Sequence, residues 1–287
     1  MCSVAGAPET ATKFGKGEVE TMLQVLETWG NENPSLGVRH TDSLVELFDN
    51  LETLSQNPQP CSVFVPDVEA ARQAAWVRTV LQVPFEIVVL TGPTTRRALT
   101  MYLINSLVEP RFHGLGQSIV NVIDPFIETR FLLSSVFSLN QPRPSLSQML
   151  QSLAKSSVFE ADVNVGSVEK ITAAKWSAHP DGISIEARTW NPDRDSPLEL
   201  SPAHTHFTLQ AVSKDSAWGQ RQGKNWVEAS WTNESVDTIR KALKNNIKPR
   251  HCQRCEQYVV GNICANCGFA AESSPEPDET KQSLEAL

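Results

Sequence analysis

The chain has 287 residues, of which 40% are hydrophobic, and it includes seven Trp and eleven Phe. That apolar content is enough for one large domain or two ordinary ones, which excludes a disordered chain. The formal net charge of −8 disfavours a protein that coats nucleic acid with its whole surface. No apolar run approaches the roughly eighteen residues that a membrane span requires, so we expect no membrane contact.

The N-terminal segment contains neither a basic stretch nor an apolar one, so it predicts no secretory signal, and the cysteine usage favours the cytoplasm. We expect residues 1–15 to be disordered because they are rich in Ala, Thr and Gly. Met1-Cys2 invites comparison with enzymes that use an N-terminal cysteine as nucleophile. The Gly-rich or Asn-Gly signature typical of the glutamine amidotransferases does not follow, so we favour the disordered start.

Residues 16–157 predict a helical lead-in and then an α/β part. Apolar residues at helical spacing indicate two helices within 17–56, which we interpret as a packing or partner surface. Three apolar runs then predict buried strands at 61–66, 85–90 and 118–123. A helical pattern follows each run, at 67–81, at 91–108 and around 131–137. Strands that alternate with helices predict a mostly parallel sheet with flanking helices.

Binding sites in such sheets form where the strands end. Thr91-Gly-Pro-Thr-Thr-Arg-Arg97 opens a helix at one such end, and a helix N-terminus could contact a phosphate. The segment lacks the Walker A pattern, and capping of the helix by Thr94 and Thr95 explains it better. Asp124, at the end of the third predicted strand, is either a weak catalytic candidate or a helix cap.

The segment Val122-Ile-Asp-Pro-Phe126, read as a strand that ends before a helix, is similar to phospholipase-D-like nuclease domains and their degenerate relatives. That resemblance implies a phosphodiesterase or nuclease whose histidine attacks the phosphodiester from an H-x-K motif. No histidine of this chain is followed two residues later by lysine. His204 and His206 are the nearest candidates, so the resemblance supports a fold at most.

Residues 158–249 change to an alternating pattern, which predicts antiparallel strands at 159–165, 182–190, 206–212 and 226–231 and a helix over 233–246. His204 and His206 lie two residues apart, on one face of a strand, where they could bind a metal or transfer protons. We favour ordinary residues at a sheet edge, because no carboxylate lies at a diagnostic spacing. The dense tryptophans of this part could stack on bases, but a place in the core explains them better.

Residues 250–271 contain two C-x-x-C pairs, Cys252/Cys255 and Cys264/Cys267, separated by eight residues. Four thiolates at this spacing can surround one tetrahedral Zn²⁺, and the insert is long enough for a short hairpin. Gly268 suits the positive φ that closes such a knuckle. The segment resembles a zinc ribbon, with a structural zinc ion. Disulfides and a thioredoxin-like redox motif are the weaker alternatives.

Six basic residues and no acidic ones occupy 238–255, directly before and within the ribbon: Arg240, Lys241, Lys244, Lys248, Arg250 and Arg254. They could contact phosphates, or they could be the solvated end of a helix. Residues 272–287 are acidic, and we expect them to be disordered.

Two hypotheses follow. The favoured one is a non-catalytic zinc-ribbon protein whose α/β platform and ribbon contact nucleic acid or a protein partner, in a nucleic-acid-processing or defence complex. The alternative is a phosphodiesterase of phospholipase-D-like fold. The sequence does not indicate an oligomeric state.

Overall fold

The computed structural model describes the following residues: 3–5, 40–41, 62–65, 68–82, 85–109, 112, 115–137, 139, 142–153, 157–188, 196–209 and 226–270. The acidic tail at 272–287 and the two helices expected within 17–56 lie outside this part of the chain, except for the described residues 40–41. Within 1–15, where disorder is predicted, Ser3–Ala5 forms strand β1. Among the described helices, none combines the length and the apolarity needed to cross a membrane.

A four-stranded parallel sheet forms the first layer, in the order β2-β1-β3-β4. Its other strands are β2 (His40–Thr41), β3 (Ser62–Val65) and β4 (Glu86–Val89). Helix α3 (Val68–Leu81) joins β3 to β4 and packs on one face of the sheet, as predicted from the sequence. Both faces of β3 are covered, because Val63 and Val65 contact α3 whereas Phe64 belongs to the main core.

The third predicted strand is wrong, because Gly116–Ile123 forms helix α5, which follows helix α4 (Thr94–Leu107). Its buried residues Ile119, Val120 and Ile123 recur at helical spacing. A short apolar run cannot be assigned to a helix or a strand from periodicity alone. A single 3-10 turn, η2 (Asp124–Phe126), ends the helix.

The helix expected around 131–137 is also wrong, because Ile127–Leu133 forms strand β5. Ile127, Thr129 and Phe131 are buried on one face, and the residues between them are only half-buried. This period of two is that of a strand. β5 pairs with β12 (Trp226–Thr232) and β6 (Val158–Asp162), so the second sheet crosses the boundary that the sequence predicts at 157/158.

The second sheet has six strands in the order β11-β9-β12-β5-β6-β7. All neighbours are antiparallel except β9 and β11, which are parallel. The remaining strands are β6 (Val158–Asp162), β7 (Ser167–Ile171), β9 (Ile183–Arg188), β11 (Thr205–Leu209) and β12 (Trp226–Thr232). A mixed α/β fold with a parallel and a mostly antiparallel part is thus confirmed.

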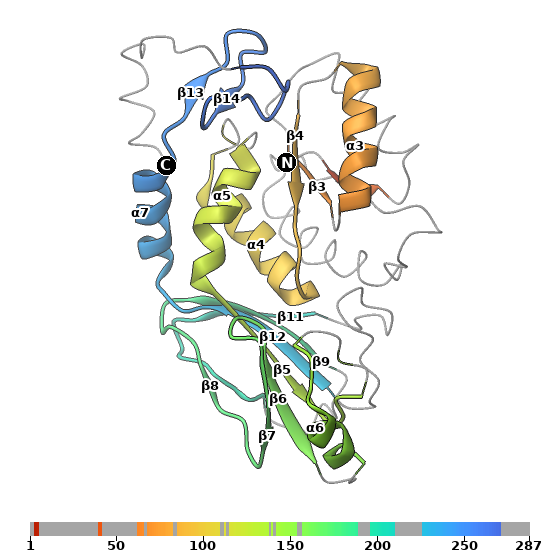
Figure 1. The fold of residues 1–287 in the computed structure, drawn as a ribbon. Coiled ribbons are helices and arrows are strands. Elements are labelled where there is room, and N and C mark those ends of the chain that lie inside the picture. Colours follow the sequence, from red (N-terminus) through yellow and green to blue (C-terminus); the bar gives the residue numbers. More distant parts are fainter. Residues whose placement is uncertain are drawn as a thin grey trace.

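The two faces of the second sheet are covered differently. Helix α4 covers the inner face, and α5 packs on α4 and on β4, so that one continuous core joins the six-stranded sheet to the parallel sheet (Figure 1). Two short strands, β8 (Trp176–Ser177) and β10 (Leu198–Glu199), cover the outer face. Trp176 stacks there on Trp231 with ring centroids 5.7 Å apart, so these tryptophans are core residues. Helix α6 (Leu146–Gln151) begins with a capping box formed by Ser145 and Gln148.

Helix α7 (Val236–Asn246) connects the second sheet to the cysteine-rich segment, as predicted. Ser235 caps its first turn, and its apolar residues Ile239 and Leu243 are buried in the main core, where α7 packs on α5. The chain then enters β13 (Arg250–His251) and β14 (Tyr258–Val259), which lie at the far end of the molecule from the six-stranded sheet (Figure 1).

Candidate metal centre

The four cysteines lie on two similar turns, the first knuckle (residues 250–259) and the second knuckle (residues 263–270). Each knuckle is enclosed by its own strand pairing. β13 pairs with β14 around Cys252 and Cys255, and an isolated bridge between Ile263 and Ala270 encloses the second pair. The sequence predicts a hairpin within the eight-residue insert, and that prediction is wrong. The two ends of the insert pair instead with residues on the far side of each cysteine pair. The insert instead carries the chain from one knuckle to the other, which lets the two knuckles face each other.

The sulfur atoms are close enough to share one ion. All four lie within 4.8 Å of one another. The Sγ atoms of Cys252 and Cys267 are 3.8 Å apart, and those of Cys255 and Cys264 are 3.6 Å apart. A tetrahedron with metal–sulfur bonds of about 2.3 Å has edges of about 3.8 Å. The cluster thus fits one tetrahedral metal ion.

Backbone amides help to prepare the first cysteine of each knuckle for metal binding. Burial raises the pKa of Cys252, but hydrogen bonds from the N–H groups of Cys255 and Arg254, together with those from the side chains of Cys255 and Cys264, outweigh it and lower the pKa to about 7. Burial likewise raises the pKa of Cys264, and the amides two and three residues further along oppose that rise. The same donors in both knuckles stabilise the thiolates that a metal requires.

The residue after each second cysteine has a left-handed backbone. Gly268 has φ +76°, as the sequence predicts for a knuckle-closing glycine. Glu256, at the equivalent place in the first knuckle, has φ +58° although it carries a side chain. These two positive φ values let the N–H groups of Glu256 and Gly268 bond back to the carbonyl oxygens of Cys252 and Cys264.

The ribbon, residues 250–270, is attached to the body by side chains from two directions. Arg78, in the last turn of α3, donates to the carbonyl oxygen of Ala265 at 2.6 Å and to that of Phe85 at 3.2 Å. Tyr258 packs on Phe112 with ring centroids 4.8 Å apart, and it also contacts the main core. The ribbon therefore has a defined position above α5 and β4 (Figure 1).

The six basic candidates for nucleic-acid contact have different surroundings. Arg250 is used inside the ribbon, because it donates to the oxygens of Gly261 and Asn262 at 2.7 and 2.8 Å. Arg240 forms an ion pair with Asp237. The other four are exposed or half-buried on α7 and the first knuckle: Lys241, Lys244, Lys248 and Arg254.

Arg254 lies directly over an aromatic ring. Its guanidinium carbon is 3.3 Å from the ring centroid of Phe269, a residue of the second knuckle that is 49% exposed. This cation–π pair joins the two knuckles at the surface. The sequence alone could not reveal it, because fifteen residues separate the partners.

The catalytic candidates are not brought together. His204 and His206 flank the start of edge strand β11, whereas Asp124 precedes β5, three strands away, or about 14 Å at ordinary strand spacing. Asp124 is bound by Arg96 at 2.7 Å. His206 shares a 2.8 Å hydrogen bond with Ser184, which is fully buried, and burial lowers the pKa of His206.

The resemblance to phospholipase-D-like domains is not supported. It depends on a strand that ends at Asp124 and a helix that follows, but the structure places helix α5 before Asp124 and strand β5 after it. The order of helix and strand is thus reversed. The phosphodiesterase hypothesis is therefore unsupported, because the order of elements differs from the one it requires and its candidate site residues lie apart.

Most of the turn at Thr91–Arg97 is buried, although Thr91 is exposed and Arg96 is half-buried. Glu228, a fully buried residue of β12, accepts hydrogen bonds from the N–H and the hydroxyl of Thr95 at 2.7 and 2.9 Å. This carboxylate occupies the position at the helix N-terminus where an anion would bind. Neither Thr94 nor Thr95 caps α4, so the predicted cap is also wrong.

The fold and the site define an α/β protein with a C-terminal four-cysteine ribbon. No family model and no curated protein matches the chain. Among solved structures, it is similar to a DegV family protein from Eubacterium eligens loaded with heptadecanoic acid. The two are 9% identical, with a TM-score of 0.41, and the match covers 65% of this chain and 78% of that one.

Proposed function

We propose that this chain is a non-catalytic zinc-ribbon protein of the cytoplasm, whose α/β body holds the ribbon against nucleic acid in a nucleic-acid-processing or defence complex. The ion would be Zn²⁺, because four sulfur ligands at tetrahedral spacing are typical of structural zinc. With every ligand position taken by sulfur, such an ion has no place for a reacting water. Its role would be to hold the two knuckles together.

The observation that carries the proposal is the pairing of Arg254 with the exposed ring of Phe269. Proteins that bind single-stranded nucleic acid combine aromatic rings, on which bases stack, with cations that follow the backbone. Three further lysines precede this pair in the chain, Lys241 and Lys244 on α7 and Lys248 between α7 and β13, and they would add positive charge to the contact. A ribbon fixed to the body would present both features in one orientation.

The test is binding of a labelled 20-nucleotide single strand, followed by fluorescence anisotropy over a range of salt concentrations. The triple variant Lys241→Gln/Lys244→Gln/Lys248→Gln should weaken binding and make the slope of log K against log salt shallower by about 2, at roughly 0.7 per lost phosphate contact. Lys170→Gln/Lys175→Gln, which removes two exposed lysines on and after β7, is the control and should leave the slope unchanged.

Two further results bear on the proposal. Cys252→Ser should reduce the zinc content from about one ion per chain to none and should also lower binding at low salt. A wild-type chain that does not bind the strand at low salt, or a triple variant with an unchanged slope, would overturn the proposed contact with nucleic acid.

A further inference from the structure

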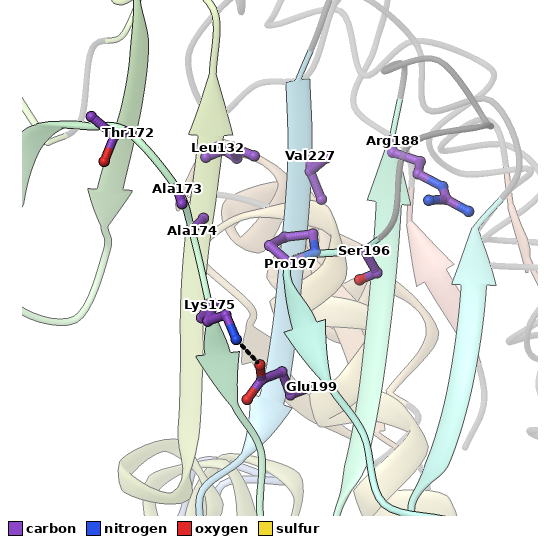
Figure 2. A pocket seen from close by; sticks show the side chains of 10 residues that line it. All are labelled: Leu132, Thr172, Ala173, Ala174, Lys175, Arg188, Ser196, Pro197, Glu199 and Val227. Atoms are coloured by element: carbon purple, nitrogen blue, oxygen red, sulfur yellow. Dashed lines mark hydrogen bonds and ion pairs between the residues drawn. The ribbon is translucent and has the colours of Figure 1, made fainter.

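A cavity of about 430 Å³ lies on the outer face of the six-stranded sheet (Figure 2). The ribbon lies at the other end of the molecule (Figure 1). Leu132 on β5 and Val227 on β12 form its floor. These residues are direct cross-strand partners, and they are 6% and 4% exposed, so their side chains make one apolar patch. The volume lies within the range of about 300–1,000 Å³ that is usual for small-molecule sites.

Two chain segments form the walls. Thr172, Ala173 and Ala174 lead into β8, and Ser196 and Pro197 lead into β10. The segments are joined where the N–H of Trp176 donates to the carbonyl oxygen of Pro197 at 2.8 Å. Small side chains on both walls leave the space above the apolar floor open, and two hydroxyl groups lie along it.

The charged groups of the cavity are paired with each other. Lys175 and Glu199, one from each wall, form an exposed ion pair at 2.9 Å (Figure 2). Arg188, on β9, pairs with the buried carboxylate of Glu186 at 3.5 Å, and that carboxylate also accepts from the hydroxyl of Ser196. An ion that entered the cavity would meet no uncompensated opposite charge and would lose its own hydration.

We propose that this cavity binds a small uncharged molecule with an apolar body and hydrogen-bonding groups at its edge. The apolar body lies on Leu132 and Val227, and the polar edge meets the hydroxyl of Thr172. The Ser196 hydroxyl, whose proton is already donated to Glu186, can still accept a hydrogen bond from the ligand. The Lys175–Glu199 pair stands at the mouth, where both side chains are largely exposed. This site is independent of the ribbon and of its proposed contact with nucleic acid.

The test uses N-phenyl-1-naphthylamine, an uncharged probe that fluoresces in apolar sites, with the full chain. The wild type should bind one equivalent with saturation. Ala173→Trp places a large ring in the cavity from an exposed wall position, so the fold should be retained, and it should weaken binding at least tenfold. The matched control is Leu150→Ser, which removes an exposed apolar side chain of α6 and should leave binding unchanged.

Charge selectivity is tested with 8-anilinonaphthalene-1-sulfonate, an anionic probe of similar size, which should bind at least tenfold more weakly. Binding of this anion as tight as that of the neutral probe would overturn the uncharged class of ligand. Unsaturable binding of the neutral probe, equal binding by Ala173→Trp, or loss of binding in Leu150→Ser would overturn the site itself.

Discussion

At the scale of single residues, the two knuckles solve the same backbone problem with different side chains. Each needs a left-handed residue after its second cysteine, and the chain supplies Gly268 in one knuckle and Glu256 in the other. A residue with a Cβ pays about 1–2 kcal/mol for that conformation, whereas glycine does not. The glycine after Cys267 therefore predicts a left-handed turn from the sequence, whereas the glutamate after Cys255 does not.

Gly268→Val should lower zinc affinity about tenfold, which corresponds to about 1.4 kcal/mol. The cause would be backbone strain alone, because no atom lies within 4 Å of the position where a Cβ would be placed. Gly268→Asn should cost less, since Asn tolerates positive φ, and Glu256→Gly should keep or raise the affinity. Competition with a chromogenic chelator measures each value. Equal losses for Val and Asn would contradict the explanation by φ.

At the scale of elements, one buried carboxylate helps to decide that 116–123 is a helix. Glu86 of β4 accepts from the N–H of Gln117 at 3.1 Å and from the hydroxyl of Ser62 at 3.2 Å, and so caps the start of α5. Gly116 permits this contact, because a Cβ there would lie 2.7 Å from Val88. Burial raises the pKa of Glu86 to about 7, partly opposed by these hydrogen bonds.

The stability of the protein should therefore fall as pH rises from about 4.5 to 7. In that window the unfolded state ionises Glu86 while the folded state keeps it protonated, so the unfolded state binds fewer protons. Glu86→Gln cannot ionise and should remove up to about 3 kcal/mol of this decline. Chemical denaturation at several pH values measures it, with the exposed Glu169→Gln as control. A Glu86→Gln curve that declines as steeply as the wild type would rule out this role.

At the scale of the whole molecule, the ribbon is positioned by contacts between segments far apart in the chain. Arg78 of α3 contacts Ala265 in the second knuckle, 187 residues further along the chain. Phe112, which precedes α5 in the chain, packs on Tyr258 of the ribbon. β5 similarly joins the six-stranded sheet from within the predicted α/β part. The molecule is thus held together by long-range contacts that cross the predicted domain boundaries.

Arg78→Met should loosen the ribbon without releasing its metal, because the guanidinium contacts a backbone carbonyl and no cysteine. Amide hydrogen exchange over 250–270 should become about tenfold faster, as expected for the loss of about 1.5 kcal/mol from one charged hydrogen bond. Zinc content should stay at about one ion per chain. Arg143→Met, an exposed arginine three residues before α6, is the control. Unchanged exchange in Arg78→Met would mean that Tyr258 alone holds the ribbon.

The sequence by itself determined the features that depend on short-range chemistry. The cysteine spacing predicted the cluster, Gly268 its turn, and the alternating patterns of 158–249 most of the second sheet, because each is encoded within a few residues. The sequence did not predict that a helix precedes Asp124 and a strand follows it. The apolar residues Ile119, Val120 and Ile123 are compatible with either element, and contacts with Glu86 and the core favour the helix.

The structure, and not the sequence, shows which partners the basic residues contact. Six basic residues look equivalent in the sequence, yet Arg250 is used inside the ribbon, Arg240 pairs with Asp237, and Arg254 lies on Phe269. It also separated Asp124 from the histidines and placed Glu228 at the start of α4. The Arg240–Asp237 pair is local, because both residues lie within one turn of α7. The other outcomes depend on partners eleven or more residues away in the chain, and local residue patterns do not encode such contacts.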